Sequence, residues 1–352
     1  MAHPALAREL GRAASPAFGI LDQRAALEWV QHNIARVGGD PDNVTLFGQS
    51  AGAWSTCVHL VAPKSRGLFA RAIMMSGACA DALYFTPQTA EAQGEALAAK
   101  VGCSGDDVLA CLRHKSGEEI LGALPFRRGL LLLPGVWWGP IADGVELPRM
   151  PLTMLRAGDF AHVPLMIGSA RDEGIVHTRA FESVTADELS WFVGNVFGDA
   201  VVKRVTERYQ RATLKQALTD IVTDGIFACQ ARRVARIVSA QHVPVYLYQW
   251  THALDDPRVH ALGATHGIDL FFLFGNVSLG FGLQQNELPL AAQVMDAWGA
   301  FARSGNPETA TLRWPRYAVD SDAHMTLDLP IHPGARLLRE TCDFWDQTSG
   351  DL

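Results

Sequence analysis

The sequence lacks the long apolar run that a membrane-spanning segment requires. Its longest purely aliphatic stretch, Leu130–Leu133, is stopped by Pro134, whereas a helix needs about 20 apolar residues to cross a bilayer. The first twenty residues also contain no continuous apolar stretch of the kind found in secretory signals. The sequence therefore predicts no membrane span.

Basic charge and cysteine are also sparse. Lys and Arg total 30 against 37 Asp and Glu, the net charge is −7, and no basic block stands out. A nucleic-acid partner is not expected, because such proteins carry a concentrated positive surface. The six cysteines are too few for a disulfide scaffold in 352 residues and lack paired metal-ligand spacing. Cys103 and Cys111 differ, because they bracket a short loop that could close a local disulfide; the alternative is two free thiols.

The composition is that of a globular enzyme, with 48% hydrophobic and 19% charged residues. Segments typical of buried strands alternate with segments typical of helices, which indicates an α/β fold with a mostly parallel central sheet flanked by helices. The region 180–240 is helical in character and predicts a helical subdomain inserted into that fold. The expected strands are Val44–Phe47, Ala70–Met75, Val163–Gly168 and Val243–Trp250, and the expected helices are Leu21–Val37, Thr89–Lys100 and Met295–Arg303.

The segment Gly48–Gly52, with sequence Gly-Gln-Ser-Ala-Gly, carries the first candidate for chemistry. It lies directly after an expected strand and directly before an expected helix, which is the context that a nucleophile elbow requires. There Ser50 would project above the sheet, flanked by glycines because larger side chains would collide with neighbouring backbone. The backbone N–H of Ala51 would point toward the oxyanion of a reacting carbonyl. The pattern therefore predicts Ser50 as a nucleophile.

A serine needs a base within hydrogen-bond reach, and the base needs an orienting acid. In an α/β-hydrolase the order along the chain is serine, acid, histidine, and each partner lies on a loop beyond the carboxyl end of a strand. Glu173 meets this requirement after Val163–Gly168, and its neighbour Asp172 is the alternative acid.

Among the twelve histidines, His266 is the candidate base. It lies in Gly263–Gly267, where small residues would let a loop approach the serine closely. His252 and His260 also follow the last expected strand, and spacing alone leaves both as alternatives.

Longer segments of the chain resemble the type-B carboxylesterase (carboxylesterase/cholinesterase-like) family. The resemblance begins before the elbow and extends nearly to the C-terminus. It is carried by Gly19–Val30, Gly38–Gly52, Gly67–Ile73 with Ser76-Gly77, Gly139-Pro140 with Asp143-Gly144, Asp172–Gly174, His266-Gly267, Phe274-Gly275, Trp298–Pro307, Trp314-Pro315 and Phe344-Trp345.

This resemblance implies a single α/β-hydrolase domain over residues 1–352 that cleaves small-molecule carboxylic esters through an acyl-enzyme. It implies Ser50, Glu173 and His266 as the catalytic triad, a disulfide near Cys103 and Cys111, and no metal or organic cofactor. Aromatic residues near these motifs either line an apolar substrate pocket or belong to the core: Trp54, Trp137, Trp138, Phe271 and Phe272.

Two features depart from the family pattern. Members carry a glycine-rich oxyanion loop ahead of the serine, but the only Gly-Gly pair here, Gly38-Gly39, lies at the wrong end of the nucleophile strand. We therefore expect a chain without the N-terminal part of the family domain, with Val44–Phe47 along an unpaired apolar edge. The alternative function is a remnant with little or no activity. The second departure from the family pattern is Gln49, which stands where many members have glutamate.

Overall fold

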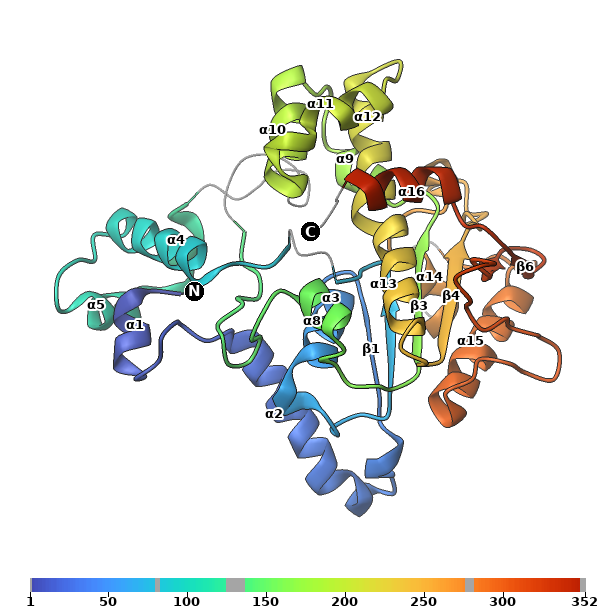
Figure 1. Cartoon of the computed structure of the whole chain (residues 1–352), viewed down its shortest axis with the longest axis horizontal. Helices are drawn as coiled ribbons and strands as arrows, with labels where there is room; N and C mark the ends of the chain where they lie inside the picture. Colours follow the sequence, from blue (N-terminus) through green and yellow to red (C-terminus); the bar gives the residue numbers. More distant parts are fainter. Residues whose placement is uncertain (1, 80–82, 125–136, 276–281, 349–352) are drawn as a thin grey trace.

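The computed structural model describes residues 2–79, 83–124, 137–275 and 282–348 (Figure 1). At its centre is a six-stranded sheet whose spatial order is the order of the chain. The first five strands are parallel, and the sixth is antiparallel to the fifth. The predicted α/β class is therefore confirmed. The strands are β1 (Thr45–Gln49), β2 (Arg71–Met75), β3 (Leu165–Ala170), β4 (Val245–Trp250), β5 (His324–Leu327) and β6 (His332–Gly334).

Helices cover both faces of the sheet, so the strands are buried from two sides. Alternate residues of a strand enter different cores: Ala72 and Met74 pack on the side of α3 (Ala51–Val61), whereas Ile73 and Met75 pack on the side of α15 (Leu288–Ser304). Outside residues 180–240, the other α-helices of the described residues are α1 (Pro4–Glu9), α2 (Phe18–Asn33), α4 (Pro87–Lys100), α5 (Val108–His114), α6 (Gly117–Gly122), α8 (Pro151–Ala157), α9 (Gly174–Thr178), α14 (Asp269–Phe274) and α16 (Arg339–Thr348).

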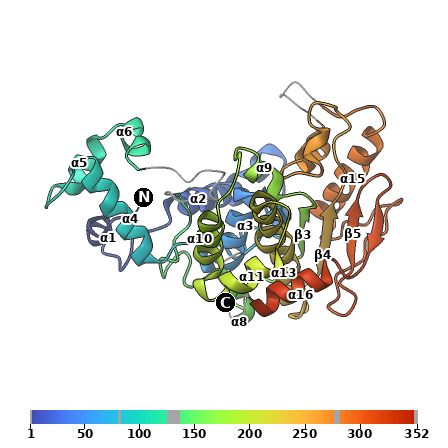
Figure 2. The same ribbon diagram turned by 90° about the horizontal axis from the view of Figure 1, so that it is seen from above.

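The region 180–240, which the sequence predicts to be helical, lies between β3 and β4 and is mostly helical. It contains α10 (Ala186–Phe197), α11 (Val202–Arg208), α12 (Leu214–Ile221), the π-helix η6 (Val222–Ala228) and α13 (Cys229–Ser239). Figure 1 shows α10, α11 and α12 gathered at one edge of the molecule, whereas α13 runs alongside the sheet. In Figure 2, α1, α4 and α5 lie at the end of the molecule remote from β5.

Strand β1 is the outermost strand of the described sheet. It pairs with β2 over five residues, and no other described strand pairs with its far side. The side chain of Phe47 is 48% exposed on this strand, whereas all six residues of β3 are buried. Strand β1, which leads into Ser50, therefore has an open edge in the part of the chain that the structure describes.

Three disulfides tie the described elements together. Cys103 is bonded to Cys111 across the short loop between α4 and α5. The other two were not predicted: Cys57–Cys79 joins α3 to the segment after β2, and Cys229–Cys342 joins the first residue of α13 to α16. The helices in the described residues include none that is long and apolar enough to cross a membrane.

Candidate active site

Ser50 occupies a strained corner between β1 and α3. Its φ and ψ angles are 55° and −121°, in a region that a residue with a side chain rarely adopts. A Cβ atom at Gly48 would lie 2.2 Å from the carbonyl carbon of Gly52, so this corner admits only glycine at position 48. The expected need for glycine at position 52 is wrong in this respect, because a Cβ built there meets no atom within 4 Å outside its adjacent residues and the backbone of its own helix.

The corner is held by main-chain bonds to the next strand and to its own helix. The Ser50 N–H donates to the Met75 carbonyl at 2.9 Å, and the Ser50 carbonyl accepts the N–H groups of Ala53 and Trp54 at 2.9 and 3.1 Å. Ala51 is the first residue of α3. The N–H groups in the first turn of a helix have no acceptor within that helix, and the helix dipole favours negative charge there.

The structure brings Glu173 and His266 together on loops that follow the carboxyl ends of the parallel strands β3 and β4. Glu173 follows β3 and is fully buried, and one carboxylate oxygen accepts the Ala170 N–H at 2.7 Å. The other oxygen lies 2.5 Å from His266 Nδ1. Burial lowers the pKa of His266, but the adjacent Glu173 carboxylate outweighs burial and raises this pKa above its ordinary value. The pair is therefore an imidazole oriented and made more basic by a buried carboxylate.

The other nitrogen of His266 faces the nucleophile corner. His266 Nε2 lies 3.3 Å from the side-chain nitrogen of Gln49, the residue just before Ser50. Because Nδ1 is bonded to a carboxylate, we assign the ring proton to Nδ1, so that Nε2 accepts a hydrogen bond from the Gln49 amide. Among the described residues, Gln49 rather than the Ser50 hydroxyl bonds to Nε2. The importance of Gln49 at this point was not evident from the sequence.

The alternative acid and bases lie elsewhere. The Asp172 carboxylate accepts the Ala264 N–H at 2.8 Å and pairs with Arg171, so it holds the loop that carries His266 instead of contacting the imidazole. His260 is exposed and bonds to the Leu254 carbonyl at 2.8 Å. Of these candidates, Glu173 and His266 are thus the acid and the histidine that contact each other, whereas Asp172 and His260 bond to other groups.

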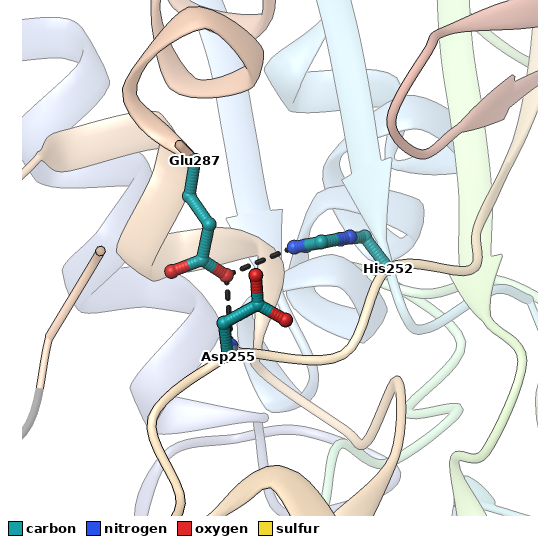
Figure 3. A group of neighbouring side chains, drawn as sticks. All are labelled: His252, Asp255 and Glu287. Carbon is teal, nitrogen blue, oxygen red and sulfur yellow. Dashed lines mark hydrogen bonds and ion pairs between the residues drawn. The ribbon is translucent and has the colours of Figure 1, made fainter. Parts of the chain in front are cut away.

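His252, the other alternative base, belongs to a separate cluster with Asp255 and Glu287 (Figure 3). The three could offer one nitrogen and two oxygen ligands to a divalent cation, because these atoms lie within 4.8 Å of one another. They are, however, already bonded: His252 Nε2 lies 2.9 Å from Glu287, and its Nδ1 lies 3.2 Å from Asp328. The same Glu287 oxygen accepts the Asp255 N–H at 3.0 Å. The cluster therefore links the loop after β4 to the start of α15.

A further buried carboxylate lies near the pair. Asp269 is 2% exposed in α14, three residues after His266, and its Oδ2 lies 3.5 Å from the Tyr248 hydroxyl. Burial and the nearby Glu173 charge raise the pKa of Asp269 to about 7. Asp269 in turn raises the pKa of His266. In the sequence, the only indication that Asp269 belongs near the site was its position three residues after His266.

The aromatic residues expected near the site divide into two groups. Trp54 of α3 stacks on Phe227 at 6.2 Å, and Phe227 lies 5.0 Å from the His266 ring. In contrast, Phe272 is fully buried against Trp250 and belongs to the core.

The other expected aromatic residues have different surroundings. Trp137 is buried against Phe85. Trp138 lines a cavity of about 290 Å³ with Gln23 and Ser55, and neither Ser50, Glu173 nor His266 is part of that lining. Phe271 is half-buried at the edge of the core cluster around α15.

Known proteins resemble this chain along almost its whole length. Residues 10–345 match the carboxylesterase family. Acetylcholinesterase from Bungarus fasciatus is 32% identical over 365 residues, which cover 94% of this chain and 59% of that protein. Carboxylesterase 1C from Rattus norvegicus is 30% identical, covering 93% of this chain and 62% of that protein. A solved structure of PNB esterase has a TM-score of 0.81 at 30% identity, covering 93% of this chain and 68% of that one. The chain thus spans less than two thirds of the length of these curated relatives.

Proposed function

The chain belongs to the carboxylesterase family and has the α/β-hydrolase fold, and from this membership we propose that it hydrolyses carboxylic esters with Ser50 as nucleophile. The observation that carries the proposal is the 2.5 Å contact of Glu173 with His266 Nδ1, which leaves Nε2 facing the elbow. A small-molecule ester is the substrate class, and none of the steps requires a cofactor.

Acylation begins when the Ser50 hydroxyl replaces the Gln49 amide as the partner of His266 Nε2. Ser50 Oγ attacks the ester carbonyl carbon as its proton passes to Nε2, and the carbonyl oxygen becomes an oxyanion near the Ala51 N–H. The tetrahedral intermediate collapses, the bond to the alcohol oxygen breaks, and His266 gives its proton to the departing alcohol. Glu173 stabilises the imidazolium throughout, without taking the proton itself.

Deacylation repeats these steps with water. His266 takes a proton from water, whose oxygen attacks the acyl carbon, and the second tetrahedral intermediate expels Ser50 Oγ. The proton on Nε2 returns to Ser50, and the carboxylic acid leaves. Both half-reactions use the same base and the same oxyanion position.

A second candidate is a chain with little turnover of its own. It is favoured by the place of the only Gly-Gly pair in the chain, at the end of β1 remote from Ser50: Gly38 ends the turn Ile34–Val37, ahead of β1. The Ala51 N–H is then the oxyanion donor that the elbow itself supplies, and each missing donor costs about 10²–10³ in turnover. The open edge of β1 is consistent with this second candidate function.

Hydrolysis of a short aryl ester, combined with labelling by a fluorophosphonate, distinguishes the two. Turnover and labelling that both disappear in Ser50→Ala, but persist in the matched helix variant Ser55→Ala, would support the esterase. Labelling of Ser50 with negligible turnover would favour the second candidate. Absence of labelling in a folded protein would contradict an activated serine altogether.

A further inference from the structure

A second imidazole lies against that of His266. His177 is on α9, four residues after Glu173, so both side chains emerge from the same side of one helical turn. The His177 and His266 ring centroids are 5.0 Å apart and the rings are inclined at 60°, an edge-on contact. His177 is 7% exposed. Glu173 and His177 thus approach the same imidazole from one short helix.

Phe227 completes a triangle of rings. It comes from the π-helix η6 and lies 5.4 Å from His177 and 5.0 Å from His266. Trp54 of the nucleophile helix stacks on the other side of Phe227 at 6.2 Å. A π-helix carries an extra residue per turn and is frequent at functional sites. The His266 ring is therefore confined by two rings as well as by its bond to Glu173.

Helix α9 has little freedom to move away from His266. The Gly174 N–H donates to Thr223 Oγ1 at 2.9 Å, and the hydroxyls of Thr178 and Thr219 are 2.7 Å apart. A Cβ atom at Gly174 would lie 2.1 Å from the Thr219 carbonyl oxygen, so α9 and α12 are in backbone contact. The His177 ring is consequently held in place against the His266 ring.

Charge on His177 would be felt directly by His266. The charged groups that act on the His266 imidazole are Glu173, which is already bonded to it, and Asp269 of α14. Other charged groups on the elements around α9 are engaged elsewhere: Lys215 with the Phe181 carbonyl, Asp220 with Arg211, Asp224 with Tyr209, and Arg171 with Asp172. Two positive rings 5.0 Å apart would repel each other in this buried setting.

We propose that His177 is a positioning residue for the ester hydrolysis proposed above: its ring holds the His266 imidazole against Glu173, and its protonation in acid opposes the imidazolium that His266 must become. The inference rests on the proposed function. Phenylalanine at position 177 would keep a ring packed against His266 but could carry no charge. Alanine would remove both the ring and the charge.

The test compares His177→Phe and His177→Ala with the parent and with His114→Phe, a variant at an exposed histidine of α5. For His177→Phe we expect kcat at pH 8 close to that of the parent and an acid limb of log kcat/KM against pH whose slope falls by about one, because one fewer proton is coupled. For His177→Ala we expect kcat about 10-fold lower with little change in KM, because the base is misplaced rather than the substrate. His114→Phe should match the parent. An unchanged slope in His177→Phe together with a normal kcat in His177→Ala overturns the proposal.

A readout independent of turnover separates this inference from the proposed function. In histidine-labelled Ser50→Ala protein, the His266 resonance followed by NMR should titrate at higher pH when His177→Phe is added, because a repelling charge is lost. Identical His266 titrations with and without His177→Phe would refute the coupling even in an active esterase. A shifted titration in a protein without turnover would instead support the coupling while the esterase proposal fails.

Discussion

Gln49 and Glu173 bond to opposite ring nitrogens of His266: the Gln49 amide lies 3.3 Å from Nε2, and the Glu173 carboxylate lies 2.5 Å from Nδ1. A neutral amide thus occupies the position that the Ser50 hydroxyl takes in the proposed mechanism, and a charged carboxylate holds the opposite nitrogen. The amide can hold the ring tautomer without adding a second negative charge to the base.

Replacing Gln49 by glutamate should shift the acid limb of activity to higher pH. A carboxylate within about 4–6 Å of an imidazole favours the charged ring and raises its pKa by about one unit or more. Since general-base catalysis needs the neutral ring, half-maximal kcat/KM should move up by about the same amount. Gln49→Met, which keeps the length and adds no charge, should show no upward shift. Equal pH profiles for the two variants would contradict the assigned contact.

Removing the charge of Glu173 should be far more damaging than removing that of Asp172. Glu173→Gln leaves a buried amide beside Nδ1 and favours the wrong tautomer, which in the serine–histidine–acid template costs about 10⁴ in kcat. Asp172→Asn weakens one bond to the loop at Ala264, so we expect a loss of about 10-fold or less. Steady-state kinetics on one aryl ester measures both. Comparable losses would mean that Asp172 orients the base as much as Glu173 does.

The buried Asp269 should make stability fall as the pH rises toward neutrality. Burial raises the pKa of Asp269 to about 7 from its ordinary value of 3.8, so the folded protein holds this proton where the unfolded chain has lost it. The stabilisation is complete below about pH 4 and is lost by about pH 7. Asp269→Asn should therefore unfold later than the parent at pH 8 and similarly at pH 4. Denaturant unfolding at both values tests this, and a larger stabilising effect at pH 4 would have the wrong sign.

Local sequence was sufficient to predict the elbow and the strands around it. The run Val44–Phe47 followed by Gly48–Gly52 specifies a strand, a corner and a helix within a few residues of one another. Strand β5 has only four residues, and its place is decided by pairing with β4. Such pairing leaves no periodic signal in so short a segment.

Contacts between distant segments could not be predicted in the same way. Gln49 and His266 are 217 positions apart, and Cys57 and Cys79 are joined across a crossover. Spacing proposed Glu173 and His266 together with alternatives, and the family resemblance selected them, but neither indicated His177 or Asp269. Their positions depend on how α9 and α14 are packed around one imidazole.

The buried Arg232 links helix α16 to the segment before β5 through ion pairs, and loss of its buried partner should destabilise the fold strongly. Arg232 of α13 is 1% exposed and donates to Asp322, which is fully buried, at 2.9 Å. The same guanidinium lies 2.8 Å from Asp343 of α16, which is 46% exposed. Burial raises the pKa of Asp322, but hydrogen bonds from Arg232 and its charge outweigh burial and lower it.

Asp322→Asn removes the one fully buried partner of Arg232 and leaves only the partly exposed Asp343 and Asp346. Breaking a buried ion pair in this way typically costs about 3–5 kcal/mol. Asp343→Asn removes a partner at the surface, where water can take its place, and should cost about 1 kcal/mol or less. Urea unfolding of both variants and the parent measures the difference. Ester hydrolysis at 25 °C, assayed well below the unfolding midpoint, should change little in Asp343→Asn. If the two substitutions destabilise equally, solvent reaches Asp322 and its ion pair with Arg232 is not a buried one.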